Sequence, residues 1–228
     1  MAAVRQHAEI KRWFWKRRSF ADRLRIAFWQ VRQDGVWSLR SGLFKRSEQL
    51  PLSVANDPRF AFLNDPRTDI ETSRLRLTTF DISDLERLVG LFEPDAGRDS
   101  TQPRYWTVEY ILAHELLAGY QTWVINLRTT GECIGHCSLT EMRIDGVVEQ
   151  EIGYRVGERH RGHGYATDAA TAVREFLFQR GVTRVISTIA TDNTASQRVA
   201  VKNGMHWEKQ IEKHGRPVEI YAAVRDAD

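Results

Sequence analysis

The sequence predicts a mixed α/β domain in residues 70–228, and three observations predict it. Segments in which apolar and polar residues alternate, typical of half-buried strands, share the chain with segments whose apolar residues recur at helical spacing. One such strand, 149–156, continues into a glycine-containing loop at 157–164, and the loop opens a helix at 166–178. Turn signals rich in glycine, asparagine and aspartate separate the elements. Strands and helices are therefore expected within one domain.

The domain is expected to contain six to seven strands and four helices, in the order β-α-α-β-β-β-α-β-α-β-β. Thr129–Glu132 joins the second and third strands as a hairpin, and Asp145-Gly146 turns the chain into the fourth. Arg180-Gly181 and Asn203-Gly204 are helix stop signals. The predicted strands are 72–80, 120–128, 133–143, 149–156, 184–190, 206–212 and 218–225, and the predicted helices are 81–92, 107–117, 166–178 and 195–202.

Residues 1–50 form a basic, aromatic-rich extension that is expected to be helical, with apolar residues at helical spacing between residues 8 and 32. The extension carries twelve Lys and Arg against four Asp and Glu, or +8, whereas residues 51–228 carry 21 against 26, or −5. Its apolar face is expected to pack on its own domain or on a second copy in a homodimer. Alternatives are a membrane surface, an acidic protein, or the ribosome through its RNA. Residues 51–69, with repeated proline turns, are a linker.

Cys133 and Cys137 lie about 13 Å apart in an extended strand, too far for a disulfide, and are expected to be free thiols. No further cysteine or histidine pair accompanies them, so no structural metal is expected. No apolar run reaches the roughly 20 residues that span a bilayer. The expected location is the cytoplasm, with the extension as a candidate contact to a membrane surface.

A strand that feeds a glycine loop at the start of a helix gathers several backbone N–H groups at the positive end of the helix dipole. Such a site suits an anion, most often a phosphate. The loop here lacks the Gly-Lys-Ser/Thr ending of nucleotide-triphosphate loops, because Gly162 is followed by His163 and Gly164. It also fails the dinucleotide pattern, in which Thr167 would have to be a third glycine.

The loop instead meets the pattern R-x-x-G-x-A with Arg161, Gly164 and Ala166. E-I-G-Y precedes it at 151–154, and N-x-x-S-x-R-V-A-x-K-N-G follows at 193–204. This ordered set resembles the GCN5-related N-acetyltransferases (the GNAT superfamily), in the branch that contains the ribosomal-protein N-terminal acetyltransferases. The resemblance covers roughly residues 70–225 and implies a mixed, mostly antiparallel sheet flanked by helices, with acetyl-CoA as co-substrate.

The resemblance also implies roles for individual residues. Asn193 and Ser196 would lie at the end of the pantetheine and near the sulfur, with Ser196 as candidate proton donor to the thiolate, although both also suit a helix cap. Backbone groups of Tyr154, Arg155 and Val156 would bind the pantetheine arm. The residues expected to bind the pyrophosphate are Arg161, Gly162, His163, Gly164, Tyr165, Ala166 and Thr167.

Glu151 is the preferred candidate for the base that takes a proton from the acceptor ammonium, because it occupies the E-I-G-Y position. Glu149 lies on the same strand face, and Glu141 is the reserve. The structural alternative is that Glu151 is solvated or paired with Arg143 or Arg155. The expected activity is transfer of an acetyl group to a primary amine of a peptide N-terminus or a small molecule. A non-catalytic acyl-CoA-binding sensor or assembly subunit is the alternative.

Overall fold

The computed structural model describes residues 68–92, 119–213 and 215–225. The predicted extension, most of the linker and the predicted helix at 107–117 lie outside the described residues. The structure does not test the predicted helical form of the extension or the predicted helix at 107–117.

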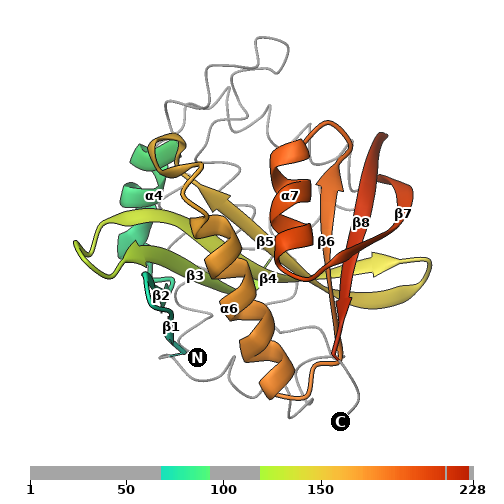
Figure 1. Cartoon of the computed structure of the whole chain (residues 1–228), viewed down its shortest axis with the longest axis horizontal. Coiled ribbons are helices and arrows are strands. Elements are labelled where there is room, and N and C mark those ends of the chain that lie inside the picture. Colours follow the sequence, from blue (N-terminus) through green and yellow to red (C-terminus); the bar gives the residue numbers. More distant parts are fainter. Residues whose placement is uncertain (1–67, 93–118, 214, 226–228) are drawn as a thin grey trace, which may run out of the picture.

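The described residues contain one sheet of eight strands in the order β1-β2-β3-β4-β5-β6-β8-β7 (Figure 1). All neighbours pair antiparallel except β5 and β6, which are parallel. The mixed, mostly antiparallel sheet is thus confirmed, with one strand more than expected. The strands are β1 (Ile70–Glu71), β2 (Leu75–Thr79), β3 (Gly119–Leu127), β4 (Cys133–Ile144), β5 (Val147–Val156), β6 (Arg184–Ala190), β7 (His206–Lys213) and β8 (Arg216–Val224).

The helices cover the two faces of this sheet. They are the 3-10 turn η3 (Ile82–Asp84), α4 (Leu85–Phe92), the 3-10 turn η5 (Glu158–His160), α6 (Tyr165–Gln179) and α7 (Thr194–Lys202). α6 and α7 lie over one face and bury their apolar residues in the main core (Figure 1). α4 packs on the other face, where the Phe92 ring meets the His136 ring edge-on with centroids 5.8 Å apart.

Alternation along β4 and β5 separates the two faces. Ile152 and Tyr154 belong to the core under α6, together with Cys137 and Leu139, their partners across β4. The alternate residues of β5, which include Glu151 just before Ile152, therefore face the opposite side of the sheet. One strand thus presents its core residues to the helices and its candidate base to the other face.

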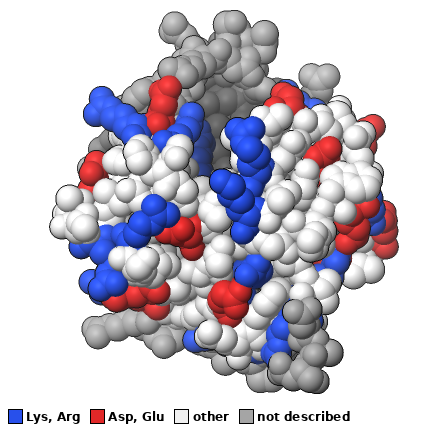
Figure 2. Space-filling model, viewed as in Figure 1, with Lys and Arg blue, Asp and Glu red and all other residues white. Residues whose placement is uncertain are grey.

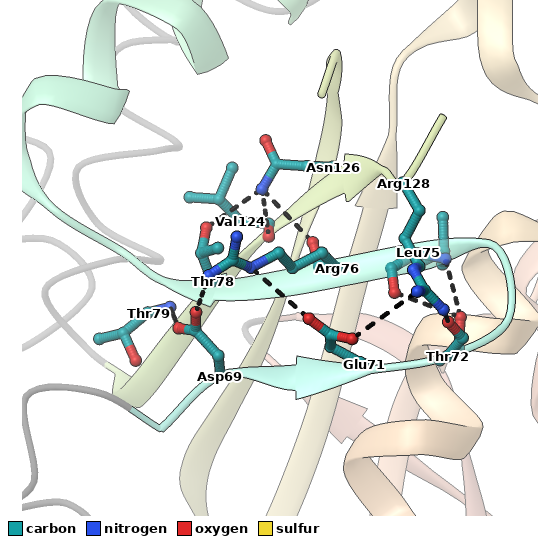
Figure 3. A network of polar contacts seen from close by, with 10 residues as sticks. All are labelled: Asp69, Glu71, Thr72, Leu75, Arg76, Thr78, Thr79, Val124, Asn126 and Arg128. Carbon is teal, nitrogen blue, oxygen red and sulfur yellow. Dashed lines mark hydrogen bonds and ion pairs between the residues drawn. The ribbon is translucent and has the colours of Figure 1, made fainter. Parts of the chain in front are cut away.

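Polar contacts tie β1, β2 and β3 together at the free edge of the sheet (Figure 3). Arg76 on β2 pairs with Asp69 at 3.0 Å, and the buried Asn126 amide on β3 donates to Thr78 Oγ1 at 3.1 Å. Arg128, just after β3, donates to the Thr72 carbonyl at 2.9 Å. The turn between β1 and β2 is therefore fixed to the neighbouring strand.

β5 and β6 separate soon after they meet. Glu151 and Ile186 are the one register pair between them, and beyond it the strands diverge toward the glycine loop and the start of α7 (Figure 1). Backbone groups on the facing edges of two diverging strands cannot bond each other. Beyond this pair the two strand edges are not paired with each other, and this separation of the backbones beside the loop is the gap between β5 and β6.

Candidate active site

The glycine loop ends in a helix N-terminus, as its sequence predicts. Gly162 and Gly164 have φ of 82° and 81°, in the left-handed region that glycine adopts readily. Gly164 is the N-cap of α6 and has no side chain to offer, so no side chain caps the first turn. The first backbone N–H groups of α6 thus remain available for an anion.

Contacts from neighbouring segments hold the loop. Arg161 Nε donates to the Val156 carbonyl at 3.2 Å, and the His163 Nδ1 atom lies 2.9 Å from the Arg161 carbonyl oxygen. His160 Nε2 lies 3.3 Å from a Glu132 carboxylate oxygen on the β3–β4 hairpin. The loop is therefore attached to both β5 and the β3–β4 hairpin.

The gap between β5 and β6 begins at a hydrogen bond that the sequence patterns do not indicate. The buried Ser187 hydroxyl on β6 donates to the Ile152 carbonyl at 2.7 Å. Because carbonyls alternate sides along a strand, the backbone groups of Tyr154 and Val156 face the same gap. The Arg155 carbonyl instead faces β4, where it lies against Gly135, and the Arg155 guanidinium stacks over the Phe92 ring at 4.5 Å.

The start of α7 contacts β5 beside the gap. Asn193 caps this helix through its side-chain oxygen, which accepts from the Ser196 backbone N–H at 3.1 Å, so the predicted capping role is confirmed. The Tyr154 hydroxyl donates to the Ser196 carbonyl at 2.9 Å and joins β5 to α7 across the gap. Burial raises the pKa of Tyr154 well above its ordinary value, so this hydroxyl keeps its proton at neutral pH.

Glu151 is held on the sheet face opposite α6 by groups from β4, β6 and β7. One carboxylate oxygen accepts from the Thr188 backbone N–H at 3.2 Å and also from the Thr188 hydroxyl. The other oxygen lies 3.4 Å from Thr140 Oγ1 and 3.7 Å from the Lys213 ammonium nitrogen. The carboxylate is mostly buried, with 16% of its side chain exposed, and it borders the point where β5 and β6 separate.

The other candidate carboxylates differ in position. Glu149 pairs with Arg184 at 3.1 Å on β6, away from the separation point. Glu141 on β4 is register partner of Gln150 and is partly buried. The alternative partners predicted for Glu151 were wrong: Arg143 donates to the Gly146 carbonyl, and Arg155 stacks on Phe92. The Glu151 carboxylate instead contacts Thr188 and Lys213, which are distant from it in sequence.

Basic side chains flank a hollow on the face that carries α6 and α7 (Figure 2). They lie over the glycine loop and α7. The exposed basic residues of these segments are Arg159, Arg161, Arg198 and Lys202. A phosphate-bearing ligand would meet favourable charge here in addition to the loop N–H groups.

A second depression lies at the opposite end of α6. This open groove of about 980 Å³ is lined by residues that include Arg174, His206 and Trp207. None of the loop or gap residues lines it, so its size does not make it the active site. Within the described ranges, no group of three or more His, Cys, Asp or Glu could hold a metal ion, and no helix is long and apolar enough to cross a membrane.

Comparison with known proteins identifies the family of this chain. A family model described as "Acetyltransferase (GNAT) domain" matches residues 74–206. The chain is 34% identical over 164 residues to the uncharacterized protein YkkB of Bacillus subtilis (strain 168), covering 68% of this chain and 95% of the relative. It is 27% identical over 180 residues to the uncharacterized N-acetyltransferase YoaA of the same organism, covering 68% and 96%.

Solved structures show the same fold. A putative ribosomal-protein-serine acetyltransferase from Vibrio cholerae superposes with a TM-score of 0.56 at 20% identity, covering 70% of this chain and 99% of that one. RimL, a ribosomal L7/L12 alpha-N-protein acetyltransferase in complex with coenzyme A, gives 0.54 at 24% identity, with the same coverage. Family match, relatives and fold agree with a glycine loop beside a split sheet: the chain belongs to the GNAT acetyltransferase family and is an acyltransferase.

Proposed function

We propose that this enzyme moves the acetyl group of acetyl-CoA to a primary amine, of a peptide N-terminus or a small molecule, by direct attack of the amine on the thioester. The observation that carries the proposal is the separation of β5 and β6 beside the glycine loop, with Glu151 at the separation point. Such a gap lets a thioester entering from the α6 side meet an amine arriving from the other face.

The pyrophosphate is assigned to the loop N–H groups from Gly162 to Thr167, with Arg161 and His163 beside them. The pantetheine arm is assigned to the gap. There the backbone groups of Tyr154 and Val156 have no strand partner on the β6 side, and an amide-containing chain can bond them as a strand would. When this ligand arrives, the Arg161 side chain has to release or share the Val156 carbonyl.

The chemical step needs a neutral amine and a proton for the departing thiolate. Glu151 takes a proton from the acceptor ammonium, directly or through water. The amine nitrogen then attacks the thioester carbonyl carbon, the new C–N bond forms, and the C–S bond breaks. The nitrogen gives up its surplus proton to solvent to leave the neutral amide, and Glu151 releases its own proton to solvent after the product leaves. The Ser196 hydroxyl is proposed to protonate the CoA thiolate and to recover its proton from solvent. Its position in the first turn of α7, capped by Asn193, keeps it beside the gap.

A non-catalytic acyl-CoA-binding subunit is the rival, because ligand binding requires only the loop and the gap. Purified protein should be incubated with acetyl-CoA and a panel of small amines and short peptides. Release of free CoA thiol and acetylated amine in equal amounts supports the enzyme. Tight acetyl-CoA binding with no amine-dependent thiol release from any member supports the rival.

The N-terminal extension is proposed to act in location or assembly rather than in acetyl-CoA binding. Its charge of +8 over 50 residues and its four tryptophans, among seven in the chain, favour an anionic surface or an apolar protein face. A membrane surface, an acidic protein, the ribosome and a second copy of the chain are the candidate partners, within a cytoplasmic setting.

A further inference from the structure

We propose that Arg74 is a positioning residue for the glycine loop, and that its guanidinium fixes the direction of the peptide unit between His163 and Gly164. Arg74 precedes β2, about ninety residues before the loop in sequence. This inference rests on the proposed placement of the pyrophosphate at the loop.

Arg74 contacts the loop and the first turn of α6 at the same time. Its Nη1 donates to the His163 carbonyl at 2.9 Å, and its Nε donates to an Asp168 carboxylate oxygen at 2.7 Å. The guanidinium also lies over the Tyr165 ring, 5.0 Å from its centroid. The planar fork of an arginine can serve two acceptors in fixed directions, which a lysine ammonium cannot do.

The turn that carries Arg74 is itself fixed. The Arg74 N–H donates to Thr72 Oγ1 at 3.2 Å, and the Arg74 carbonyl accepts from the Arg128 N–H at 3.0 Å. The Arg128 side chain holds the Thr72 carbonyl in the same turn (Figure 3). The Arg74 side chain therefore extends from a turn at the edge of the sheet, and contacts other than those with the loop hold the backbone of this turn.

The His163 carbonyl is the group whose direction matters for an anion. In a trans peptide the carbonyl and the following N–H point in opposite directions, so holding the His163 oxygen on Arg74 turns the Gly164 N–H the other way. Gly164, at φ 81°, forms one end of this unit, and Gly162, at φ 82°, precedes His163; glycine backbones rotate with little steric restriction. A rotated unit would present a carbonyl oxygen, rather than a donor, to the phosphate.

Arg74 also offsets an unfavourable charge. Asp168 lies in the first turn of α6, where its carboxylate would repel a bound pyrophosphate. The ion pair with Arg74 neutralises that carboxylate. The pair is partly exposed, with 46% and 27% of the two side chains accessible, and such pairs contribute little to global stability. Its loss should therefore affect the loop more than the fold.

The test compares two acyl donors in the full-length protein. Arg74→Ala should weaken acetyl-CoA binding about tenfold in calorimetry, the effect of losing one charge-assisted hydrogen bond. Binding of S-acetylpantetheine, which has no pyrophosphate, should not change when followed by NMR titration. Arg74→Lys should fall between Arg74→Ala and the wild type. Arg76→Ala is the matched control, because Arg76 is exposed on β2 and pairs with Asp69 and Glu71; it should bind both ligands as the wild type does.

Unchanged acetyl-CoA affinity in Arg74→Ala would overturn the inference while leaving the proposed function in place. An equal loss for both ligands would also overturn it, because it would indicate a general structural role. A wild-type protein that binds acetyl-CoA no better than S-acetylpantetheine would instead contradict the pyrophosphate site itself, and with it the proposed function.

Discussion

The Lys213 ammonium nitrogen, from β7, lies 3.7 Å from the Glu151 carboxylate on β5 and 3.1 Å from Thr188 Oγ1 on β6, on the sheet face opposite α6. The carboxylate assigned to bind an acceptor ammonium therefore already has an ammonium beside it. Under the proposed mechanism, the contacts with Thr188 hold the Glu151 carboxylate in a fixed position. The acceptor ammonium competes with the Lys213 ammonium for this carboxylate.

The first prediction concerns the base. Glu151→Gln should lower kcat/KM for the amine by about 10²–10⁴-fold, the usual contribution of a general base, with acetyl-CoA affinity retained. The loss should be greatest at low pH, where more of the acceptor is protonated. A pH–rate profile for each variant measures it. Glu149→Gln is the control, since Glu149 pairs with Arg184; if Glu149→Gln alone reproduces the loss, the base is Glu149.

The second prediction concerns the competing ammonium. Lys213→Met should lower KM for the amine by roughly two- to fivefold, because partly exposed ion pairs are worth only a little free energy. Acetyl-CoA binding should stay at the wild-type value. Lys209→Met, which removes a lysine of the same strand paired with Asp145 at 2.7 Å, should leave KM unchanged. A raised KM in Lys213→Met would mean that Lys213 helps to bind the acceptor.

The third prediction concerns the core beneath the gap. Burial raises the pKa of the Cys137 thiol to about 12, whereas an unfolded thiol titrates near 8.5. Because the folded-state pKa is the higher one, this contribution to stability is complete below pH 8.5 and is lost as pH rises toward about 12.

Urea unfolding of wild type and Cys137→Ala at several pH values measures this contribution. The difference in unfolding free energy between the two proteins should shift against the wild type by about 1 kcal/mol per pH unit above pH 8.5. A difference that stays constant up to pH 10 would show that the thiol ionises as readily in the folded protein as in the unfolded one.

The fourth prediction concerns the extension. A protein beginning at Pro51 should bind acetyl-CoA with wild-type affinity, because all assigned ligand contacts lie after residue 149. It should lose either self-association or attachment to anionic vesicles. High salt should weaken only the vesicle attachment strongly, since exposed charges are screened over about 10 Å at 0.1 M. Light scattering and vesicle sedimentation distinguish the two. An insoluble product that cannot bind acetyl-CoA would mean that the extension covers the domain's own apolar surface.

Local patterns in the sequence predict most of the described fold. Alternation predicts β3 to β8 to within two residues at every strand end, and glycines predict the turn at Asp145-Gly146 and the loop at Gly162 and Gly164. β1 escapes prediction because two residues carry no periodicity. The sequence also predicts the Asn193 cap, because a cap is a local feature: its hydrogen bond with Ser196 joins residues only three positions apart.

Contacts between distant segments could not be predicted in this way. The Glu151 carboxylate is held by Thr188 and Lys213, and nothing local in the sequence connects them. Ser187 reads as an ordinary strand residue, although its hydroxyl marks where β5 and β6 separate. Arg74 is the first residue that the family model matches, but its contact with the loop depends on the tertiary fold.

Acetyl-CoA calorimetry on Gly164→Val tests whether the loop before α6 binds the pyrophosphate of acetyl-CoA. A side chain there would strain a backbone at φ 81° and intrude among the N–H donors; even its Cβ would lie 3.3 Å from the Arg74 guanidinium. Gly215→Val, at φ 74° in the β7–β8 turn with open space around it, matches the backbone strain away from the loop. We predict that Gly164→Val loses acetyl-CoA binding while Gly215→Val keeps wild-type affinity. Unchanged affinity in a folded Gly164→Val protein would show that the pyrophosphate binds elsewhere.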